Sequence, residues 1–410
     1  MEKLKLGVAG LGQRGYGMLG TFLLFPDVDV VAVCDVYEDR NNRAAEKVKE
    51  KRGSEPRKYV DFDVFLADPE LEAVYVASSW DEHIGMAIKS LRAGKTTGME
   101  VGGAYEIEEC WDLVRAYEET KTPFMFLENC CYDNFELLCT TLARKGSFGE
   151  IVHCHGAYSH DLRDEILGGK VNRHYRLDNY EKRNCENYPT HEIGPIARLL
   201  NVNRGNRFLT LSAFASKAAG LGEFTTDPRN PDKSLGGTKF NQGDIVTTVI
   251  KCAGGETITL TLDTTLPKFY SREFTVRGTK GLAIQDTNTI MIEGDTDFHS
   301  SWIPNEIMEK QLNSARNYND FLPDIWQNIT PEEAEAGHGG MDYLMLKEFV
   351  RRAINGEKMP IDVYDAAAWM CITALSEQSI ALGSAPLAVP DFTKGKWIKR
   401  PAEDVTPLKI

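Results

Sequence analysis

The chain has 410 residues, a length typical of two domains that each bury a core. Asp and Glu (61) outnumber Lys and Arg (47), which gives a formal net charge of −14. Nucleic acids and anionic membrane surfaces are bound through basic patches, so we expect neither as a partner. No apolar run approaches the roughly 20 residues that a membrane-spanning helix needs.

The nine cysteines are odd in number and form no Cys-x-x-Cys pair, so we expect neither a disulfide framework nor a zinc site. His153, His155 and His160 recur along one stretch, but no carboxylate at matching spacing completes a set of metal ligands, and no metal is expected. Met1–Gly7 leads into a strand without a charged and then apolar leader. The sequence as it stands is typical of a cytoplasmic protein, and a periplasmic location would require that an export signal had been removed.

Short apolar runs alternate with amphipathic helical segments over the first third of the chain. In chain order, we predict a strand at Leu4–Ala9, a helix from Gln13, a strand at Val28–Cys34, a helix at Arg40–Lys51, a strand at Ala73–Ala77, a helix at Glu82–Ala93, a strand at Thr97–Val101, a helix at Ile107–Glu119 and a strand at Phe124–Leu127. This alternation is typical of an α/β fold with a parallel, doubly wound sheet. We therefore predict a Rossmann domain over residues 1–133.

The pattern changes near Asn134. The elements predicted from there are a helix at Phe135–Lys145, strands at Ile151–Ser159, Phe208–Ser216, Asp244–Cys252, Glu256–Leu262 and Glu273–Val276, an irregular acidic region at Trp302–Gly337, and helices at Asp342–Ile354 and Asp365–Ala381. Strands that no longer alternate with helices favour an open, mostly antiparallel sheet. Residues 134–410 are thus predicted to form an α+β domain for substrate binding and oligomerisation, with its late helices packing at the domain junction.

A glycine-rich turn follows the first predicted strand and opens the first helix, with the sequence Gly10-Leu11-Gly12-Gln13-Arg14-Gly15. Gly10 permits a tight turn, Gly12 lets the backbone approach a pyrophosphate, and Gly15 lets helix and strand pack closely. The helix N-terminus offers its N–H groups to the phosphates. Asp35 ends the second strand, 20 residues after Gly15, where a carboxylate accepts hydrogen bonds from the adenosine ribose and repels a 2′-phosphate. The motif therefore predicts NAD binding.

Two alternatives stay open on these residues. A glycine-rich turn also occurs in Rossmann-like folds that bind no dinucleotide. Arg14 and Arg40 could contact a phosphate, which leaves NADP as a second candidate.

Glu128 and Asn129 follow the last Rossmann strand, at the edge of the sheet where ligands bind. We predict that Asn129 meets the nicotinamide amide and that Glu128 meets its ribose or the substrate.

His191 is the first candidate for acid–base catalysis, because an imidazole takes up and releases a proton near neutral pH. It stands at the start of a predicted helix, directly after Tyr188-Pro189-Thr190. Tyr158 and Tyr270 lie near strand ends, where a phenol can bind a sugar hydroxyl or simply pack in the core. A lone capping or core histidine is the competing interpretation, and the neighbouring tyrosines favour catalysis.

The chain resembles the glucose–fructose oxidoreductase/inositol dehydrogenase/MocA family over nearly its whole length. The motifs that carry this resemblance are Ser78-Ser79-Trp80-Asp81-Glu82-His83, Glu100-Val101-Gly102 and Asn184-Cys185-Glu186-Asn187-Tyr188-Pro189-Thr190-His191. In that family a Glu-Lys-Pro follows the fourth or fifth strand, and a histidine of the second domain serves acid–base chemistry. The resemblance adds Gln13, Ser79, Trp80, His83 and Glu100 to the expected cofactor site, with Trp80 covering a ring face and His83 in a mainly structural role.

One branch, glycoside hydrolase family 109, resembles the chain more closely. The shared motifs are Glu128-Asn129-Cys130-Cys131-Tyr132, Gly156-Ala157-Tyr158-Ser159-His160-Asp161, Tyr188-Pro189-Thr190-His191, Leu266-Pro267 with Tyr270-Ser271-Arg272, Gly337-His338-Gly339-Gly340-Met341-Asp342, and two C-terminal motifs beginning at Val363 and Pro390. That family contains NAD-dependent α-N-acetylgalactosaminidases. The resemblance implies a carbohydrate substrate, His338 as a further pocket residue, and a homo-oligomer, a dimer or tetramer, formed through the open sheet.

The resemblance also implies a redox-assisted cleavage. NAD⁺ would take hydride from C3 of the sugar, and the ketone would acidify the proton at C2. A base would remove that proton, and the C1 substituent would leave. Water would add, and NADH would return the hydride, so no net oxidation occurs. This route differs from the usual glycosidase route with two carboxylates.

The sequence departs from both families at identifiable positions. Val101 and Gly102 stand where the wider family has Lys and Pro, so the lysine with which a dehydrogenase polarises the reacting hydroxyl is missing, as it is in the glycosidase branch. Glu186-Asn187 and Glu192 change the bulk and charge near the expected sugar pocket. An NAD-dependent sugar or polyol dehydrogenase is the alternative function. A non-catalytic NAD-binding regulator is a third, and it would have no need of His191 with its tyrosines.

Overall fold

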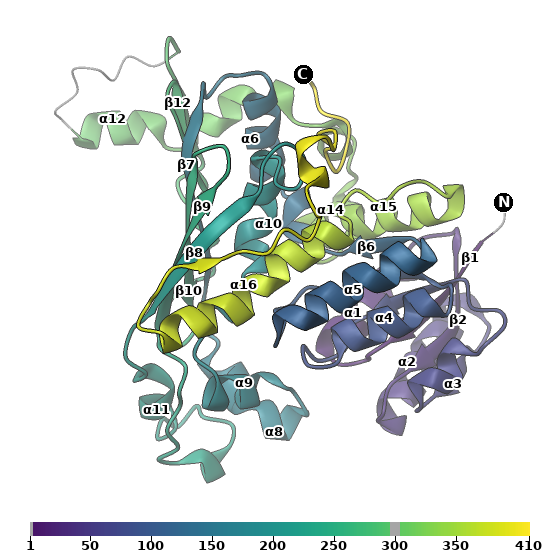
Figure 1. Cartoon of the computed structure of the whole chain (residues 1–410). Helices are drawn as coiled ribbons and strands as arrows, with labels where there is room; N and C mark the ends of the chain where they lie inside the picture. Colours follow the sequence, from purple (N-terminus) through teal and green to yellow (C-terminus); the bar gives the residue numbers. More distant parts are fainter. Residues whose placement is uncertain (1–2, 296–303) are drawn as a thin grey trace. The chain divides into compact units, whose positions relative to one another are not determined.

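The computed structural model describes residues 3–295 and 304–410 (Figure 1). The chain divides into two compact units. The first contains Met1–Asn129 and Ile329–Cys371, and the second contains Cys130–Asn328 and Ile372–Ile410. The late segment Ile329–Cys371, which the sequence pattern grouped with the second domain, therefore packs with the Rossmann residues. Within the described ranges, no helix combines the length and apolar character needed to cross a membrane.

The first unit contains a six-stranded sheet in the order β3-β2-β1-β4-β5-β6. Its strands are β1 (Leu4–Ala9), β2 (Val28–Cys34), β3 (Arg57–Tyr59), β4 (Ala73–Val76), β5 (Thr96–Met99) and β6 (Phe124–Phe126). Every neighbouring pair is parallel, which confirms the predicted doubly wound sheet. The strand order reverses between β1 and β4, and ligands of such sheets bind beyond the carboxyl ends of the strands at that point.

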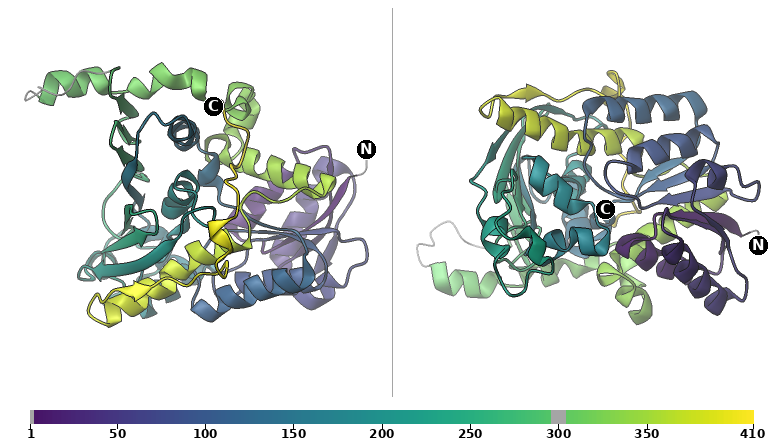
Figure 2. Two further views of the ribbon diagram at one scale, coloured as in Figure 1. Left: turned by 45° about the horizontal axis from the view of Figure 1, so that its top comes forward. Right: turned by 90° about the horizontal axis from the view of Figure 1, so that it is seen from below.

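Helices cover both faces of this sheet. They are α1 (Gln13–Phe22), α2 (Glu38–Arg52), α3 (Phe62–Leu66), α4 (His83–Arg92), α5 (Ile107–Thr120), α14 (Pro331–Glu335), the 3-10 helix η4 (His338–Gly340), α15 (Met341–Asn355) and the first part of α16 (Val363–Ala381). Figure 2 shows α4 beside α5 on one face and α1 with α15 on the other. Because both faces are covered, β4 is buried along its whole length. Trp369 of α16 is also fully buried, against Phe126 of β6.

The second unit contains an eight-stranded sheet in the order β13-β12-β11-β7-β10-β9-β8-β14. Its strands are β7 (Ile151–Ser159), β8 (Phe208–Ala215), β9 (Ile245–Cys252), β10 (Thr257–Asp263), β11 (Thr275–Gly278), β12 (Gly281–Ile284), β13 (Thr289–Ile292) and β14 (Leu387–Ala388). β7 and β10 are parallel, and the other neighbouring pairs are antiparallel. The prediction of an α+β unit with an open, mostly antiparallel sheet is confirmed.

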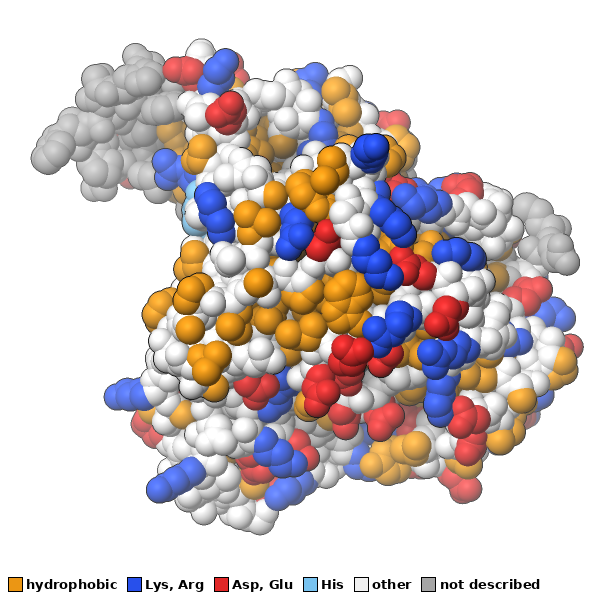
Figure 3. All heavy atoms as spheres, in the orientation of Figure 1, with side chains coloured by type: hydrophobic (Ala, Val, Ile, Leu, Met, Phe, Trp, Pro, Cys, Tyr) orange, Lys and Arg blue, Asp and Glu red, His pale blue; other side chains and the backbone are white. Residues whose placement is uncertain are grey.

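The two faces of the second sheet differ. In β9 and β10 alternate residues are fully buried, and the residues between them are half-buried or exposed. Helix α10 (Thr190–Leu199) packs on β7 at the buried face, and α6 (Asn134–Arg144) packs on α10. The opposite face carries Phe214 and Val249, which are 54 % and 40 % exposed. Figure 3 shows hydrophobic side chains gathered over β8 and the adjoining C-terminal end of α16, where Leu209 and Leu382 are exposed.

Several short elements were not predicted. In the first unit they are β3, α3 and η4, and in the second they are β12, β13, β14, α7 (Arg163–Leu167), α8 (Gly169–Asn172), α9 (Arg176–Lys182), α11 (Gly220–Phe224), and the 3-10 helices η1 (Asn129–Tyr132), η2 (Lys233–Leu235), η3 (Ser314–Phe321) and η5 (Lys396–Ile398). The region predicted to be irregular, Trp302–Gly337, contains α12 (Pro304–Gln311), α13 (Asp324–Gln327) and α14, while residues 302–303 lie outside the described ranges. These helices span four to eight residues, which is too short to show a helical repeat of apolar positions.

Candidate active site

The glycine-rich turn between β1 and α1 needs its glycines for different reasons. Gly10 has a φ of +86°, and a Cβ there would collide with the backbone oxygen of Ala77. A Cβ on Gly15 would collide with the backbone oxygen of Gly10, so this glycine lets α1 pack against β1. The position above Gly12 is open, because the atom nearest to a Cβ there is Arg40 Nη1 at 3.8 Å. An open backbone at the start of a helix fits the approach of a pyrophosphate.

Asp35 directly follows β2 at the carboxyl end of the sheet. Its carboxylate accepts hydrogen bonds from the backbone N–H groups of Leu11 (2.7 Å) and Tyr37 (3.0 Å). Arg40 Nη1 lies 3.6 Å from the same carboxylate, so this cation is paired with an acid. The arrangement favours NAD over NADP, because Asp35 would repel a 2′-phosphate. Gln13 lies at the first position of α1 with its side chain exposed.

Ser79, Trp80 and His83 form the turn that leads into α4. The backbone oxygen of Ser79 accepts the N–H of His83 at 2.9 Å. His83 is 1 % exposed, and burial lowers the pKa of its imidazole to about 4, so the ring stays neutral. A Cβ on Gly102 would collide with ring atoms of Trp80 and His83. The close packing of these two rings explains why glycine, rather than a larger residue, follows Val101.

Arg14 lies in a cluster of polar side chains that follow β1, β5 and β6. Its guanidinium donates two hydrogen bonds of 2.8 Å to Asp342, and its Nη2 lies 3.0 Å from Glu100 Oε1. Tyr75 donates its hydroxyl to Glu100 at 2.8 Å, and Asn129 donates its side-chain N–H to Asp342 at 2.8 Å. The first unit therefore brings together Arg14, Glu100 and Asn129, which were predicted for the cofactor site from separate motifs. Two carboxylates compensate Arg14.

Three tyrosines gather around His191 in the second unit. The ring centroids of Tyr188 and Tyr158 lie 4.7 and 5.7 Å from that of His191. Tyr158, near the end of β7, lies 4.7 Å from Tyr188 and 6.5 Å from Tyr270. Burial raises the pKa of Tyr158, and partial burial raises that of Tyr270, which is 47 % exposed, so both phenols stay protonated and can donate hydrogen bonds. The structure thus brings together all four residues that were predicted to be catalytic.

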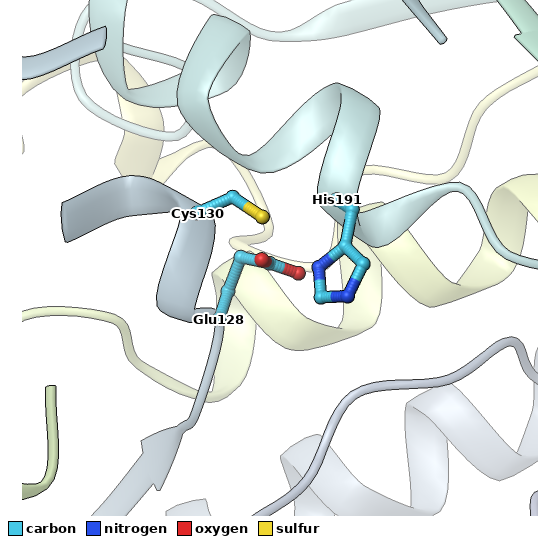
Figure 4. A group of neighbouring side chains, drawn as sticks. All are labelled: Glu128, Cys130 and His191. Carbon is cyan, nitrogen blue, oxygen red and sulfur yellow. The ribbon is translucent and has the colours of Figure 1, made fainter. Parts of the chain in front are cut away.

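Figure 4 shows how His191 is presented. It is the second residue of α10, and one of its ring nitrogens lies within 4.8 Å of the sulfur of Cys130 on η1. Glu128, also drawn, precedes Cys130 by two residues between β6 and η1 and is fully buried. The proximity of Cys130 to His191 was not predicted from the sequence, where Cys130 appeared only within the motif Glu128-Asn129-Cys130-Cys131-Tyr132.

The three histidines of the β7 stretch lie in different surroundings. His153 and His155 are on the half-exposed face of the sheet, where His153 Nδ1 lies 2.8 Å from Thr257 Oγ1. His160 follows the end of β7, and its ring lies 5.0 Å from Tyr158 and 5.3 Å from Tyr270. Burial, with the nearby charge of Arg176, lowers the pKa of His160 to about 4. His160 is therefore a neutral neighbour of the tyrosine group.

Sequence patterns missed Arg176. This arginine begins α9, and its guanidinium lies 5.4 Å from the ring centroid of Tyr188. It forms a side-chain hydrogen bond with Tyr158, and Glu165 Oε1 lies 3.3 Å from its Nη1. No periodic pattern separates Arg176 from the other charged residues of a polar stretch, so only the fold reveals that a cation adjoins the tyrosines. A second arginine, Arg272, is 5 % exposed and donates a hydrogen bond to the hydroxyl of Tyr270 at 3.1 Å.

Glu186 and Glu192, expected to alter the charge of the sugar pocket, are 0 % and 1 % exposed. Their carboxyl groups lie close together, within hydrogen-bonding reach when one of them is protonated. Glu186 accepts the N–H of Tyr188 at 3.3 Å, and Glu192 accepts the N–H of Thr261 at 3.0 Å. Burial is the main cause that raises the pKa of each carboxyl, so the pair retains a proton at neutral pH. The two acids lie beneath the Tyr188–His191 segment and present no exposed charge.

Two family models match the chain. An oxidoreductase family with an NAD-binding Rossmann fold matches residues 4–127, and the C-terminal domain of glycosyl hydrolase 109 matches residues 132–399. The chain belongs to the glycosyl hydrolase 109 family. Its first unit is an NAD-binding Rossmann domain, as the glycine-rich turn and Asp35 predicted.

The relatives of the chain match it over nearly its full length. An α-N-acetylgalactosaminidase of Tannerella forsythia is 36 % identical, with 97 % of this chain and 88 % of the relative covered. A protein of the same name from Shewanella oneidensis is 34 % identical, with 100 % and 88 % covered. A glycosyl hydrolase family 109 protein of Stenotrophomonas maltophilia is 38 % identical, with 97 % and 91 % covered. The resemblance read from the motifs is confirmed.

Solved structures share the fold at low sequence identity. Levoglucosan dehydrogenase in complex with NADH and levoglucosan has a TM-score of 0.69 at 17 % identity, with 95 % of this chain and 100 % of that chain covered. Myo-inositol 2-dehydrogenase from Lactobacillus plantarum has a TM-score of 0.65 at 15 % identity, with the same coverage. At this identity the likeness shows a common architecture, on which different chemistries can be built.

Proposed function

We propose that this protein is an NAD-dependent glycosidase that cleaves an α-linked N-acetylgalactosaminide or a closely related glycoside. The observation that carries the proposal is the group of Tyr158, Tyr188 and Tyr270 around His191, in a chain of the glycosyl hydrolase 109 family. The names of the relatives from Tannerella forsythia and Shewanella oneidensis supply the candidate sugar.

We propose a division of labour in which residues 1–133, together with the returning segment Ile329–Cys371, bind NAD, while the rest of residues 134–410 bind the sugar and mediate assembly. Bound NAD⁺ would supply a reversible hydride acceptor for C3 of the sugar. On the protein's side, Gly12 and the start of α1 receive the pyrophosphate, and Asp35 receives the adenosine ribose. Glu100 and Asn129 follow the strands at whose carboxyl ends a nicotinamide is bound in such sheets.

In the second unit the proposed roles follow from protonation. His191 moves the proton at sugar C2, because an imidazole can accept and return a proton near neutral pH. Tyr158 and Tyr270, whose pKa values are raised by burial, act as neutral donors to sugar oxygens. Arg176, close to Tyr158 and Tyr188, adds a fixed cation that stabilises negative charge developing on the sugar during C2 deprotonation.

Val101 weighs against the alternative, a sugar or polyol dehydrogenase. It occupies the place of the lysine that polarises the reacting hydroxyl in the wider family, and it is only 6 % exposed. A buried valine offers neither a charge nor a proton. A non-catalytic NAD-binding regulator would leave the His191 group without a purpose.

The experiment that tests this function follows nitrophenol release and NADH absorbance together, on 4-nitrophenyl α-N-acetylgalactosaminide and a panel of other nitrophenyl glycosides. We expect nitrophenol release without net NADH, and a loss of at least about a hundredfold in kcat for His191→Ala. The control is His153→Ala, which removes an imidazole from the half-exposed face of β7, used once light scattering has shown that it keeps the oligomeric state of the parent. Silence on the whole panel, with NADH formed from free sugars, would establish a dehydrogenase instead.

We also propose that the chain forms a homo-oligomer through the half-exposed face of the second sheet. Phe214 and Val249 lie on this face. Contiguous patches of exposed apolar residues are rare on monomers and often mark interfaces between proteins. A dimer or tetramer by light scattering, reduced to monomer by Phe214→Glu, is the expected result. A monomer for the parent chain at micromolar concentration would contradict it.

A further inference from the structure

We propose that Asp342 is the positioning residue of the NAD site, where one buried carboxylate fixes the orientation of Arg14, Asn129 and His338. Asp342 is the second residue of α15, in the segment that rejoins the first unit, and its exposed fraction is 0 %. The inference concerns cofactor binding, and it stands whether or not the glycosidase proposal holds.

The contacts of Asp342 use both of its oxygens. Oδ2 accepts hydrogen bonds from Arg14 Nη1 (2.8 Å) and His338 Nδ1 (2.7 Å). Oδ1 accepts hydrogen bonds from Arg14 Nη2 (2.8 Å) and Asn129 Nδ2 (2.8 Å). Burial alone would raise the pKa of Asp342, but the His338 hydrogen bond and the charge of Arg14 hold it well below its usual range. The carboxylate therefore stays ionised, with four donors arranged around it.

An ionised carboxylate accepts hydrogen bonds and donates none, so it dictates the orientation of its partners. The side-chain amide of Asn129 must turn its nitrogen toward Asp342, which turns its oxygen the other way. The imidazole of His338 must carry its proton on Nδ1, which leaves Nε2 as the acceptor when the ring is neutral. The fork of Arg14 is held flat between Asp342 and Glu100. Three side chains from separate stretches thus obtain one defined geometry.

The backbone around η4 is shaped to receive this carboxylate. Gly337, Gly339 and Gly340 have φ values of +71°, +64° and +94°, and His338 between them has a φ of +41°. A Cβ on Gly337 would lie 2.6 Å from Asp342 Oδ2. The turn can therefore close over the carboxylate only because residue 337 is glycine. The Gly-His-Gly-Gly-Met-Asp sequence is thereby explained as one structure, a left-handed turn folded onto the acid that follows it.

The consequence is a prediction about NAD affinity. Asn129 follows β6 and Arg14 lies in the glycine-rich turn, so both border the edge of the sheet where a dinucleotide binds. Without the acceptor, Asn129 can rotate and Arg14 can leave its position, and bound NAD must then order them itself. Ordering side chains on binding lowers affinity.

The test is Asp342→Asn, which keeps the shape and removes the charge. NAD⁺ affinity is measured by calorimetry on protein freed of nucleotide, and NAD⁺ retention is measured after gel filtration. We expect binding at least about tenfold weaker, equivalent to about 1.4 kcal/mol, and faster release. Asn129→Ala should weaken binding less when Asp342 is already Asn, because both changes remove the same orientation.

Asp68→Asn is a matched control in the same unit. Asp68 is 4 % exposed and accepts two hydrogen bonds from Arg57 (2.6 and 2.9 Å) and one from Tyr59 (2.9 Å), but it precedes β4, at the amino end of the sheet. We expect this variant to lose thermal stability, while its NAD⁺ affinity stays within about twofold of that of the parent. Equal weakening of NAD⁺ binding by both variants would mean general loosening and would overturn the proposal. So would unchanged NAD⁺ binding by Asp342→Asn.

Gly337→Ala decides the question if Asp342→Asn does not fold. It keeps every charge and pushes the turn away from Asp342, because of the new Cβ and the positive φ. We expect weaker NAD⁺ binding with the far-ultraviolet circular dichroism spectrum of the parent. An unchanged affinity in a folded Gly337→Ala protein would overturn the proposal.

Discussion

Two clusters of buried acidic side chains in this molecule have opposite protonation states. In the first unit, Asp342 is surrounded by four hydrogen bonds, three of them from Arg14 and His338, and its pKa is held low. In the second unit, Glu186 and Glu192 each accept one backbone N–H, and the remaining neighbour of each carboxyl group is the other one. The pKa of both is raised. Burial is similar at the two places, so the number and charge of the donors decides whether the acid keeps its proton.

The difference indicates two ways of building polar groups into a core. At the NAD site Asp342 keeps its charge, which the guanidinium of Arg14 balances. The carboxylate thereby fixes the orientation of the side chains around it. Next to the Tyr188–His191 segment, Glu186 and Glu192 share a proton. The proton removes charge from the pair, which then holds the segment in place through hydrogen bonds. The two clusters should therefore respond to pH and to charge deletion in opposite directions, and an exposed ion pair should respond little to either.

The largest effect is expected from Arg14→Met, which leaves Asp342 and Glu100 without their guanidinium. We expect apoprotein stability to fall by about 2–3 kcal/mol, less than the 3–5 kcal/mol of a fully buried pair, because the Arg14 side chain is 30 % exposed. The loss should be smaller at pH 5 than at pH 8, since the uncompensated carboxyls of the folded variant then take up protons. Thermal unfolding at both pH values measures it. A loss independent of pH would show that the guanidinium acts only by packing.

The next effect concerns the Glu186–Glu192 pair. Its raised pKa values mean that the folded state binds more protons than the unfolded state above the ordinary glutamate pKa of 4.5. The pair's contribution is therefore most favourable below pH 4.5 and is lost as pH rises through the raised values. Glu192→Gln keeps the hydrogen bond without a second ionisable group. We expect its Tm to match the parent at pH 5 and to exceed it by roughly 2–4 °C at pH 9. Equal Tm differences at both pH values would contradict a shared proton.

How far the sequence predicts these clusters depends on the distance along the chain between their parts. Gly10, Gly12, Gly15 and Asp35 were predicted because a short motif fixes their spacing to a strand and a helix. The pairing of Arg14 with Asp342 spans 328 positions, and no pattern in a single sequence connects them. Only the return of Ile329–Cys371 to the first unit brings them together.

The second unit shows the same limit in another form. His191 was predicted from its motif. Arg176 reaches the tyrosines from α9, and Cys130 reaches His191 from η1. Both helices are too short to show a periodic pattern of apolar residues in the sequence. The acids Glu186 and Glu192 were noticed as departures from the family, but they were expected near the sugar. Glu192 is buried because α10 packs on β7, where a Cβ on Gly156 would already lie 3.2 Å from that of Glu192.

The smallest effect is expected at an exposed pair that resembles the Arg14 cluster only in its charges. Lys89 donates to Asp63 at a similar distance, with the nearest N–O pair at 2.9 Å, but their side chains are 53 % and 70 % exposed. Water solvates both groups whether or not they meet, so the ion pair gains little. We expect Asp63→Asn to change stability by less than about 0.5 kcal/mol at pH 8, and less still in 0.5 M salt. Measured beside Arg14→Met, this variant separates the loss of a charge from the loss of a buried partner. If Asp63→Asn cost as much as Arg14→Met, charge alone would govern stability, and the contrast between the two buried clusters would lose its physical basis.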